Sequence, residues 1–393
     1  MNRHYLRGRN WFLDMGQVRS SARRESSALA ATRVSGCMTG NVPRATRTVG
    51  QARTPAAFVL RLVPVVVALG ITLSDTAGAG VLVSSHEHPN ATTSAPGDSW
   101  TPLRTLFRGS GSLLASVSCA SARLCIAVGA KGSDGVAVAG ANSWSSPVVL
   151  DRSGGLASVS CLTSGVCEAV GASAAFGPGG VTYRRMKSSW STGAGTKFAI
   201  VSVSCATADF CVGVDNQSPI GHGFVFDGRH WSAPAALKTS AESVSCPSVK
   251  VCIAIAQSGK VIFLRGRSWS NAVMVDSSGT PAAISCPNAS YCVVVDANGA
   301  ALTDEGGRWS KPKIVDSSAS LTGVSCASVK FCIAVDSAGA VLTYDGSRWS
   351  TPRVISSTIQ FTSVSCPSAK FCAAIGQNAA NDMVFATTYI ATY

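Results

Sequence analysis

The chain has 393 residues, of which 46% are hydrophobic and 13% are charged, with a formal net charge of +13. This composition supports a sizeable buried core and excludes a wholly disordered chain. Only one segment approaches the length of a membrane span, which excludes a polytopic membrane protein. Fifteen cysteines are unusual for a protein of the reducing cytosol.

The positive charge is concentrated at the N-terminus. Residues 1–61 contain eleven Arg, no Lys and two acidic residues, and they carry most of the excess charge. Once Asp75 is counted, residues 80–393 carry a net charge of only +5, and their sequence shows no extended cluster of Lys and Arg. Nucleic-acid binding needs such residues clustered on a folded face. We therefore expect no nucleic-acid partner.

An apolar segment follows this basic leader. Residues 62–73 (LVPVVVALGITL) carry no charge, follow Arg61 and precede a small-residue pattern at 77–79. Such a segment is typical of a secretory signal peptide, here 62–79. The alternatives are a single uncleaved membrane anchor over Phe58–Leu73, although a span needs about 20 residues, and a buried strand. We expect a secreted protein, or one attached to the outer face of the cytoplasmic membrane.

The leader before this segment and the linker after it contain no pattern that predicts a folded domain. Residues 1–61 are longer than the basic region of an ordinary signal peptide, and a start at Met38 would give the usual length. Residues 80–97 are rich in Ser, Thr, Pro and Gly, which is typical of a flexible linker. His86 and His88 in this linker are too few ligands for a metal site. We expect neither a metal nor a cofactor.

Seven repeats occupy residues 98–393, and two markers identify them. The first marker is a pair of cysteines with five residues between them, and first cysteines recur every 40 to 44 residues. The second marker is a Trp, usually followed by Ser. The cysteine pairs are Cys119/Cys125, Cys161/Cys167, Cys205/Cys211, Cys246/Cys252, Cys286/Cys292, Cys326/Cys332 and Cys366/Cys372. The tryptophans are Trp100, Trp144, Trp190, Trp231, Trp269, Trp309 and Trp349.

One repeat, residues 321–355, can be divided into strands. It predicts four short strands, at 321–326, 331–336, 340–345 and 348–355. Turn-forming residues separate them, and the apolar residues have no helical spacing. Four strands in a repeat of about 40 residues are typical of a β-propeller blade. We therefore predict an all-β fold, a seven-bladed β-propeller of four-stranded blades.

The two markers are out of phase, because a Trp precedes the first cysteine pair and none follows the last. Residues 98–108, which contain Trp100, would then supply the missing strand of the blade that contains 361–389. Closure of the ring by this N-terminal strand would remove free sheet edges.

The cysteine pairs are expected to face each other across a hairpin. We expect the first Cys to end the inner strand and the second to begin the next strand. Cross-strand Cβ atoms lie within disulfide reach, whereas a metal site would need four ligands. We predict seven disulfides in an exported protein; in the cytosol the pairs would be buried thiols.

Other recurring residues are interpreted as scaffold. We expect the repeated Trp to pack between blades. Aspartates recur four residues after the second Cys and also after the outer strand, and we interpret them in the same way. They are Asp215, Asp296 and Asp336, and Asp151, Asp276 and Asp316.

The repeat S-V-S-C-x5-C-x-A-V-D…G…D-G-x-x-W-S-x-P resembles the cysteine-paired β-propeller repeats of secreted bacterial proteins. Its D-G-x-x-W turn is similar to the Asp-box and kelch turns. The resemblance covers residues 98–393 and implies a propeller. It implies no particular activity, because propellers include binding modules and several classes of enzyme.

Departures from the repeat mark the candidate ligand-binding residues. The second repeat has an insertion that contains Phe176, and the third has a longer connection with Asp215, Asn216 and His222. An aromatic side chain beside polar groups would suit a glycan or peptide.

A basic turn in the second repeat is the other candidate. Arg184 and Arg185, in a turn that extends to Lys187, should lie near the opposite face and would favour an acidic partner such as an anionic cell-wall polymer. For this turn and for the longer connections, the alternative is an ordinary solvated loop.

No catalytic set stands out in residues 98–393. A sialidase-like propeller needs an arginine cluster, a Tyr nucleophile with a Glu partner, and an Asp, but only three Glu occur here. Glycosidase chemistry needs two placed carboxylates, and no pair is singled out. We expect a monomeric, exported, non-catalytic module that binds a protein or a cell-wall glycan. The alternatives are an Asp-box-type carbohydrate-active hydrolase and a purely structural surface module.

Overall fold

The computed structural model describes residues 100–108, 111–141, 143–173, 179–256 and 258–378, and the backbone of 383–389. The predicted signal segment at 62–79, the linker and Phe176 lie outside these residues. By its contacts the chain divides into two units, Met1–His86 and Glu87–Tyr393, and all described residues belong to the second. Among the described residues, no helix has the length and apolar character to cross a bilayer.

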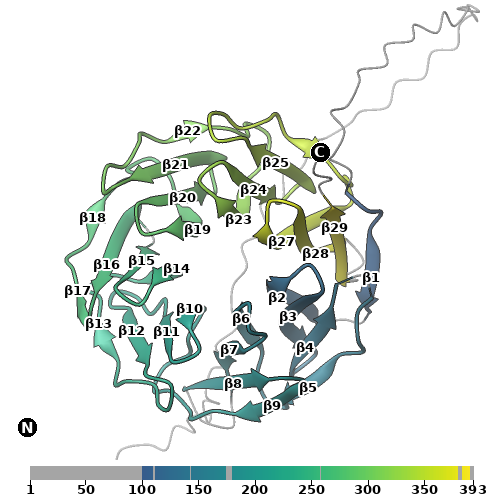
Figure 1. Ribbon diagram of the computed structural model, residues 1–393, viewed down its shortest axis with the longest axis vertical. Coiled ribbons are helices and arrows are strands. Elements are labelled where there is room, and N and C mark those ends of the chain that lie inside the picture. The colour runs from purple at the N-terminus through teal and green to yellow at the C-terminus, as the bar shows by residue number, and fades with distance from the viewer. Residues whose placement is uncertain are drawn as a thin grey trace, which may run out of the picture. The chain divides into compact units, whose positions relative to one another are not determined.

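The described residues form a β-propeller of four-stranded antiparallel blades around a central axis (Figure 1). The first three sheets, from inner to outer strand, are β2 (Ser112–Ser121), β3 (Leu124–Lys131), β4 (Asp134–Gly140), β5 (Val148–Asp151); β6 (Leu156–Cys161), β7 (Cys167–Ala172), β8 (Gly180–Met186), β9 (Ser189–Thr192); and β10 (Ser202–Thr207), β11 (Phe210–Val214), β12 (His222–Phe226), β13 (Ala235–Ala236).

The later sheets repeat this order. They are β14 (Ala241–Ser248), β15 (Val251–Ala256), β16 (Lys260–Arg265), β17 (Ser268–Trp269), with β18 (Val273–Met274) also paired to β16; β19 (Pro281–Asn288), β20 (Tyr291–Asp296), β21 (Ala300–Glu305), β22 (Lys313–Ile314); β23 (Leu321–Ser328), β24 (Phe331–Asp336), β25 (Ala340–Tyr344), β26 (Arg353–Val354); and β27 (Ile359–Ser368), β28 (Phe371–Asn378), β29 (Met383–Tyr389), β1 (Arg104–Phe107).

The last of these sheets joins the two ends of the propeller. β1 pairs antiparallel with β29, with Arg104 opposite Phe385. Trp100 packs against the apolar cluster that contains Ile333 and Phe361. The N-terminal strand therefore completes the C-terminal sheet, as the offset between the Cys and Trp markers predicts.

The outer strand of the repeat at 321–355 is shorter than predicted. Only Arg353 and Val354 form β26, and Trp349 makes a separate bridge to Tyr344. Pro352 lies between them and has no N–H to donate to a ladder. The prediction of a continuous strand over 348–355 was therefore wrong.

The inner strand of the same repeat is longer than predicted. β23 continues through Cys326 to Ser328, with a register shift between these two residues, and Ser328 pairs with Phe331. The ladder thus extends past the cysteines toward a tight turn, because the irregularity absorbs the extra residue. The prediction that the first Cys ends its strand was wrong here.

The second cysteines do not begin their strands either, with the exception of Cys167 in β7. In the other sheets the ladder includes the residue before the second Cys, which is apolar and packs beside the turn. Cys211, Cys332 and Cys372 are therefore the second residues of β11, β24 and β28, after Phe210, Phe331 and Phe371. Cys125, Cys252 and Cys292 likewise follow Leu124, Val251 and Tyr291. Their predicted position at the start of the strand was wrong by one residue.

Apolar clusters fill the space between neighbouring sheets. One cluster packs Ile253 and Val261 against Val294 and Leu302 of the next sheet, with Trp309 at its edge. A Trp occupies the same place in every such cluster, which confirms that the repeated Trp packs between blades. The others are Trp100, Trp144, Trp190, Trp231, Trp269 and Trp349.

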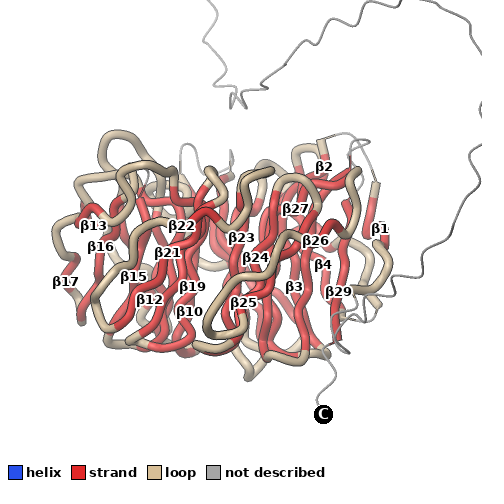
Figure 2. Tube along the Cα trace, turned by 90° about the horizontal axis from the view of Figure 1, so that it is seen from above, coloured by secondary structure: helices blue, strands red, loops and turns tan. Residues whose placement is uncertain are grey.

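The two faces of the propeller carry different connections (Figure 2). Because the strands are antiparallel, the first and third hairpins of each sheet lie on one face, which we call the tip face. The second hairpins and the links between sheets lie on the other, which we call the junction face. The cysteine pairs lie next to the first hairpin, on the tip side.

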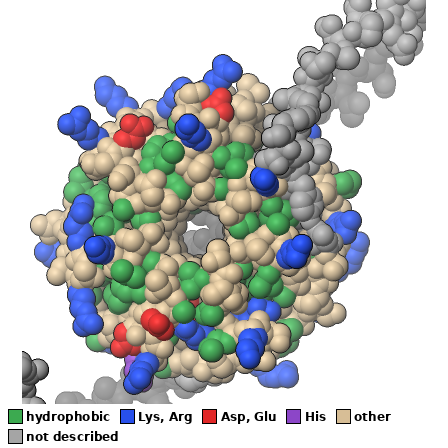
Figure 3. Space-filling model, in the orientation of Figure 1, with side chains coloured by type: hydrophobic (Ala, Val, Ile, Leu, Met, Phe, Trp, Pro, Cys, Tyr) green, Lys and Arg blue, Asp and Glu red, His purple; other side chains and the backbone are tan. Residues whose placement is uncertain are grey.

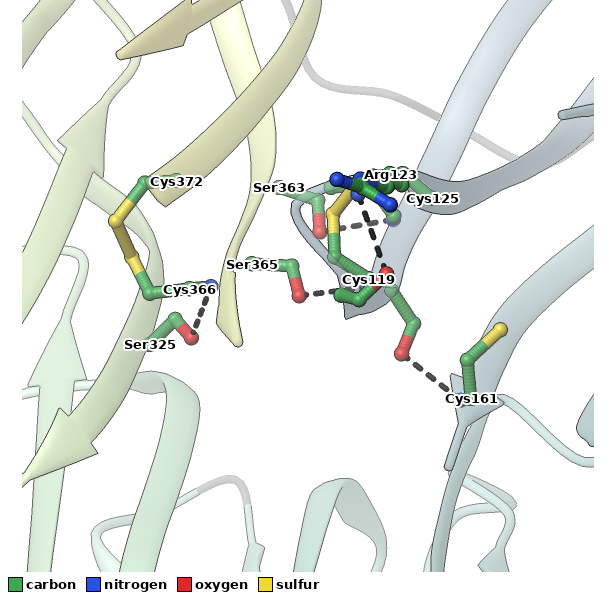
Figure 4. Close-up of a disulfide and its surroundings, with 12 residues drawn as sticks. Cys119, Arg123, Cys125, Cys161, Ser325, Ser363, Ser365, Cys366 and Cys372 are labelled. Atoms are coloured by element: carbon green, nitrogen blue, oxygen red, sulfur yellow. Dashed lines mark hydrogen bonds between the residues drawn. A yellow bond between two sulfur atoms is a disulfide. The ribbon is translucent and has the colours of Figure 1, made fainter. Parts of the chain in front are cut away.

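Serine hydroxyls link each inner strand to the next. The backbone N–H of Cys161 donates to Ser118 Oγ at 2.9 Å, and that of Cys119 donates to Ser365 Oγ at 3.0 Å (Figure 4). The latter bond connects the first inner strand to the last. The remaining pairs are Cys205 and Ser160, Cys246 and Ser204, Cys286 and Ser245, Cys326 and Ser285, and Cys366 and Ser325. This is the structural role of the second Ser in S-V-S-C.

Candidate functional site

All of the predicted disulfides are present. Each joins two cysteines six positions apart, with Cα–Cα distances between 3.9 and 4.1 Å. They join Cys119 to Cys125, Cys161 to Cys167, Cys205 to Cys211, Cys246 to Cys252, Cys286 to Cys292, Cys326 to Cys332, and Cys366 to Cys372.

The disulfides bridge neighbouring strands of one blade. Cys205 and Cys211 are direct cross-strand partners in the ladder, and so are Cys326 and Cys332. Cys372 is fully buried, and its partner strand is the inner strand β27. Within the described residues, no group of three or more His, Cys, Asp or Glu is arranged to hold a metal ion. The cysteine pairs are therefore part of the scaffold.

Two of the predicted binding residues, Asp215 and His222, meet on the junction face. His222 Nδ1 lies 2.9 Å from Asp215 Oδ2, and the backbone N–H of His222 donates to Asp215 Oδ1 at 2.8 Å. Phe198 stacks on the imidazole, with 4.3 Å between ring centroids. Asp215 is buried, so this pair holds the imidazole in one orientation against Phe198.

Phe198 was missed by sequence reasoning, although it lies in the longer second repeat. Lys197 places its Nζ 5.2 Å from the centre of the Phe198 ring. Asn216 is exposed in the same connection as Asp215 and donates from Nδ2 to Glu242 Oε2 at 3.4 Å.

The recurring aspartates bind backbone groups and meet across sheets. Asp276 Oδ1 accepts the N–H of Gly279 at 2.9 Å, and Asp296 Oδ1 accepts that of Ala300 at 2.7 Å. A Cβ on Gly279 would collide with Oδ2 of both carboxyls, so these two oxygens converge. Burial, followed by the neighbouring Asp276, raises the pKa of Asp296. The scaffold interpretation holds for this pair, because both side chains are buried.

The predicted basic turn is mostly strand. Arg184 and Arg185 belong to β8, and the Arg185 side chain is buried, with the residue only 8% exposed. Arg184 pairs with Glu168 at 3.6 Å and donates to the carbonyl of Ala208 at 2.6 Å. The placement of these two arginines in a surface turn was wrong, because β8 continues to Met186. Lys187 alone is an exposed turn residue.

The surroundings of Tyr183 are relevant to the alternative that the protein is a hydrolase with a Tyr nucleophile. Its hydroxyl donates to Asp151 Oδ2 at 3.0 Å between two blades, and both residues are buried. Burial and the bond to Asp151 raise the pKa of Tyr183 to about 12. This Tyr has an Asp partner rather than a Glu, and its environment favours the neutral donor over a nucleophilic phenolate.

A groove of about 570 Å³ separates the outer part of the β10–β13 sheet from the β14–β17 sheet. We call it the Trp groove and define it by Trp231, Trp269, Asp209, Asp227 and Arg267. Trp231 and Trp269 are half-buried, and the three charged residues are exposed. No residue of this groove was singled out by the sequence as a ligand contact.

Small residues line part of the Trp groove. Gly223 and Ala235 are cross-strand partners, and at the same register the next sheet has Val261 and Val273. A Cβ on Gly223 would lie 2.5 Å from the Trp269 indole. Glycine therefore lets the indole lie directly on β12.

Basic residues gather on the tip face. Arg123, Lys250, Lys330 and Lys370 occupy equivalent positions in the first hairpins of four sheets, and all are exposed. Figure 3 views this face and shows Lys and Arg side chains around the central opening, with few Asp and Glu. The third hairpins add Lys187, Arg229, Arg265, Arg267, Arg308 and Arg348 against Asp227, Glu305 and Asp345.

The clustering was invisible in the sequence because the basic residues of the first hairpins are at least 40 positions apart. Val249 and Val329 precede two of the lysines and are 43% and 37% exposed. The tip face thus combines positive charge with exposed apolar side chains.

These features define the chain as a disulfide-bonded β-propeller. A comparison with protein-family models and with curated proteins found no match. Among solved structures, the fold is similar to "YCF48 bound to D1 peptide", with 14% identity, a TM-score of 0.56, and coverage of 76% of this chain and 98% of that one.

Two further structures show the same likeness. "YCF48 from Cyanidioschyzon merolae" has 15% identity and a TM-score of 0.55 over 74% of this chain and 99% of that one. "Crystal structure of RRP9 WD40 repeats" has 10% identity and a TM-score of 0.58 over 76% and 99%. At these identities the likeness establishes the propeller fold alone.

Proposed function

We propose that the protein is an exported, non-catalytic, seven-bladed propeller that binds an acidic segment of another protein on its tip face. The observation that carries this proposal is the gathering of Arg123, Lys250, Lys330 and Lys370 beside Val249 and Val329. Positive charge steers an acidic partner, and exposed apolar side chains add contact area. The peptide named in the YCF48 structure supports a peptide ligand for this fold.

A labelled peptide of alternating Glu and Leu tests the proposal by fluorescence anisotropy at increasing salt. We expect binding that weakens as salt rises, and a loss of at least about tenfold in affinity for the double variant Lys330→Glu/Lys370→Glu. The matched control is Lys131→Glu/Lys238→Glu, at exposed positions of the junction face. Equal binding of a Lys/Leu peptide, or tighter binding of duplex DNA, would contradict the proposal.

Export is supported by the predicted signal peptide and by the disulfides, which persist in oxidising compartments. N-terminal sequencing and intact mass of the native protein should find a mature start near Gly80 in the medium, with the propeller cysteines oxidised. A full-length product in the cytosol, with its cysteines as free thiols, would overturn the proposal of export.

A cell-wall glycan is the second candidate partner. The observation that favours it is the Trp groove, where two half-buried indoles meet charged side chains of both signs. Sugars and aromatic side chains associate through the sugar's C–H groups and the negative face of the ring.

A further inference from the structure

We propose that the Trp groove binds a neutral sugar unit, with the pyranose ring against Trp231 or Trp269 and its hydroxyls on Asp209, Asp227 and Arg267. This inference rests on the glycan part of the proposed function and is independent of the acidic-peptide site. The groove lies at the tip side between two neighbouring sheets, whereas Lys330 and Lys370 lie in the first hairpins of other sheets.

The lining of the groove, rather than its size, departs from the repeat, because a groove of about 560 Å³ also lies between the first two sheets. In the sheets that follow, the residues in register with Ala235 are Val273, Lys313 and Arg353. Ala235 is exposed, so its small size leaves open space rather than a packed core. The groove volume of about 570 Å³ lies in the range of ordinary small-molecule sites.

The aromatic walls are held in place by the core. Trp231 and Trp269 belong to two different inter-blade clusters, and each is half-buried. Phe226 packs on Trp231 with ring centroids 5.5 Å apart. The indoles are thus fixed before a ligand arrives, which reduces the entropy lost on binding.

The charges of the groove favour a neutral ligand that has both donors and acceptors. Asp209 and Asp227 would repel an anion, and Arg267 would repel a cation. A sugar hydroxyl can donate to a carboxylate and accept from a guanidinium. Asp227 is held in place because its Oδ1 accepts the N–H groups of Arg229 and His230 at 2.9 and 2.7 Å.

Two residues distinguish this sheet from the more regular later ones. Asp209 stands at the first-hairpin position where three later repeats have Lys250, Lys330 and Lys370, and no other repeat has an acidic residue there. His230 precedes Trp231, where Arg308 and Arg348 precede the corresponding Trp. Relative to those repeats, both changes remove positive charge from the groove.

The test is calorimetric titration of the oxidised full chain with four tetrasaccharides: neutral cellotetraose and N-acetylated chitotetraose, its cationic deacetylated form, and anionic tetragalacturonate. We expect a neutral oligomer to bind, with a change in Trp fluorescence, and the charged forms to bind at least about tenfold more weakly. Ala235→Val and Asp209→Lys, which introduce residues used by the other sheets, should each weaken binding about tenfold. Val273→Ala, on an equally exposed outer strand, is the matched control and should change nothing.

Three results would overturn the inference: no binding of either neutral oligomer, tightest binding of a charged one, or affinity unchanged by Ala235→Val and Asp209→Lys. The acidic-peptide assay on the same proteins separates the two sites. Ala235→Val should keep peptide affinity, and Lys330→Glu/Lys370→Glu should keep sugar affinity, so that either site can fail alone.

Discussion

Glu168 is a carboxyl at a position where the other repeats have an apolar residue, such as Ile126, Val212 or Ile253. It is only 3% exposed, and Arg184 lies 3.6 Å away. Burial raises its pKa from 4.5 to about 7, in spite of the nearby arginine. The Glu168 carboxyl therefore holds a proton more tightly in the folded protein than in the unfolded chain.

We predict that Glu168 makes the stability of the protein depend on pH. Its raised pKa gives a stabilisation that is complete below pH 4.5 and is lost as the pH rises through about 7. The unfolding free energy of the wild type, relative to Glu168→Gln, should fall over this range by up to about 3 kcal/mol. Urea unfolding at several pH values measures this fall in the unfolding free energy. Parallel pH profiles for wild type and Glu168→Gln would contradict the prediction.

Ser204 makes a second prediction at this scale. Its Oγ accepts the N–H of Cys246 at 2.9 Å, so Ser204→Ala would leave that N–H without its acceptor. We expect a loss of about 1–3 kcal/mol in unfolding free energy. Ser248, whose Oγ accepts the N–H of Lys250 in an exposed turn, is the control, and Ser248→Ala should cost less. If Ser204→Ala and Ser248→Ala lower the unfolding free energy equally, the hydrogen bond between sheets adds nothing to stability.

The cysteine pairs and the meeting of Asp215 with His222 could be anticipated, because both are visible as regularities or breaks of the repeat. The pairing of Glu168 with Arg184 and the Trp groove could not be anticipated. Their surroundings depend on strand register, and Gly223 and Ala235 are too small to stand out in a sequence. The effect of a missing side chain appears only when its cross-strand neighbours are known.

Within a blade, three of the four strands of residues 321–355 were predicted to within two residues of their ends. The outer strand was not, because Pro352 interrupts the ladder between Trp349 and Arg353. Several outer strands carry exposed apolar residues, such as Val273 and Ile314, which give them the pattern of a strand even where few ladder bonds form.

Each disulfide should stabilise its own hairpin. Replacing Cys246 and Cys252 together by Ala removes a cross-link that closes a short loop, and the chain-entropy model gives a loss of about 2 kcal/mol. Urea unfolding of the oxidised protein measures this loss. The same double change at Cys286 and Cys292 should cost a similar amount, since the geometry repeats. A cost near zero in both would mean that the hairpins form equally well without the cross-link.

At the scale of the whole molecule, β1 completes the sheet of β27, β28 and β29, and Phe107 is buried against the first sheet. A chain that begins at residue 111 should therefore lose about 2 kcal/mol or more, because burial of one Phe side chain contributes about that much. The free edge of β29 should also promote association. Size-exclusion chromatography with light scattering and thermal unfolding measure both effects. A chain beginning at residue 98 is the control, and identical behaviour of the two would contradict the role of β1.

The distribution of covalent links has a consequence for how the protein acquires its fold. Every disulfide joins cysteines six positions apart, whereas the next cysteine along the chain is more than thirty positions away. Loop-closure entropy then favours the correct partner at every step. Under the proposed export, the cysteine pairs would enter an oxidising compartment one after another, so native pairing would need an oxidant but little reshuffling. Joining of the two ends through β1 and β29 comes last and rests on hydrogen bonds and packing alone.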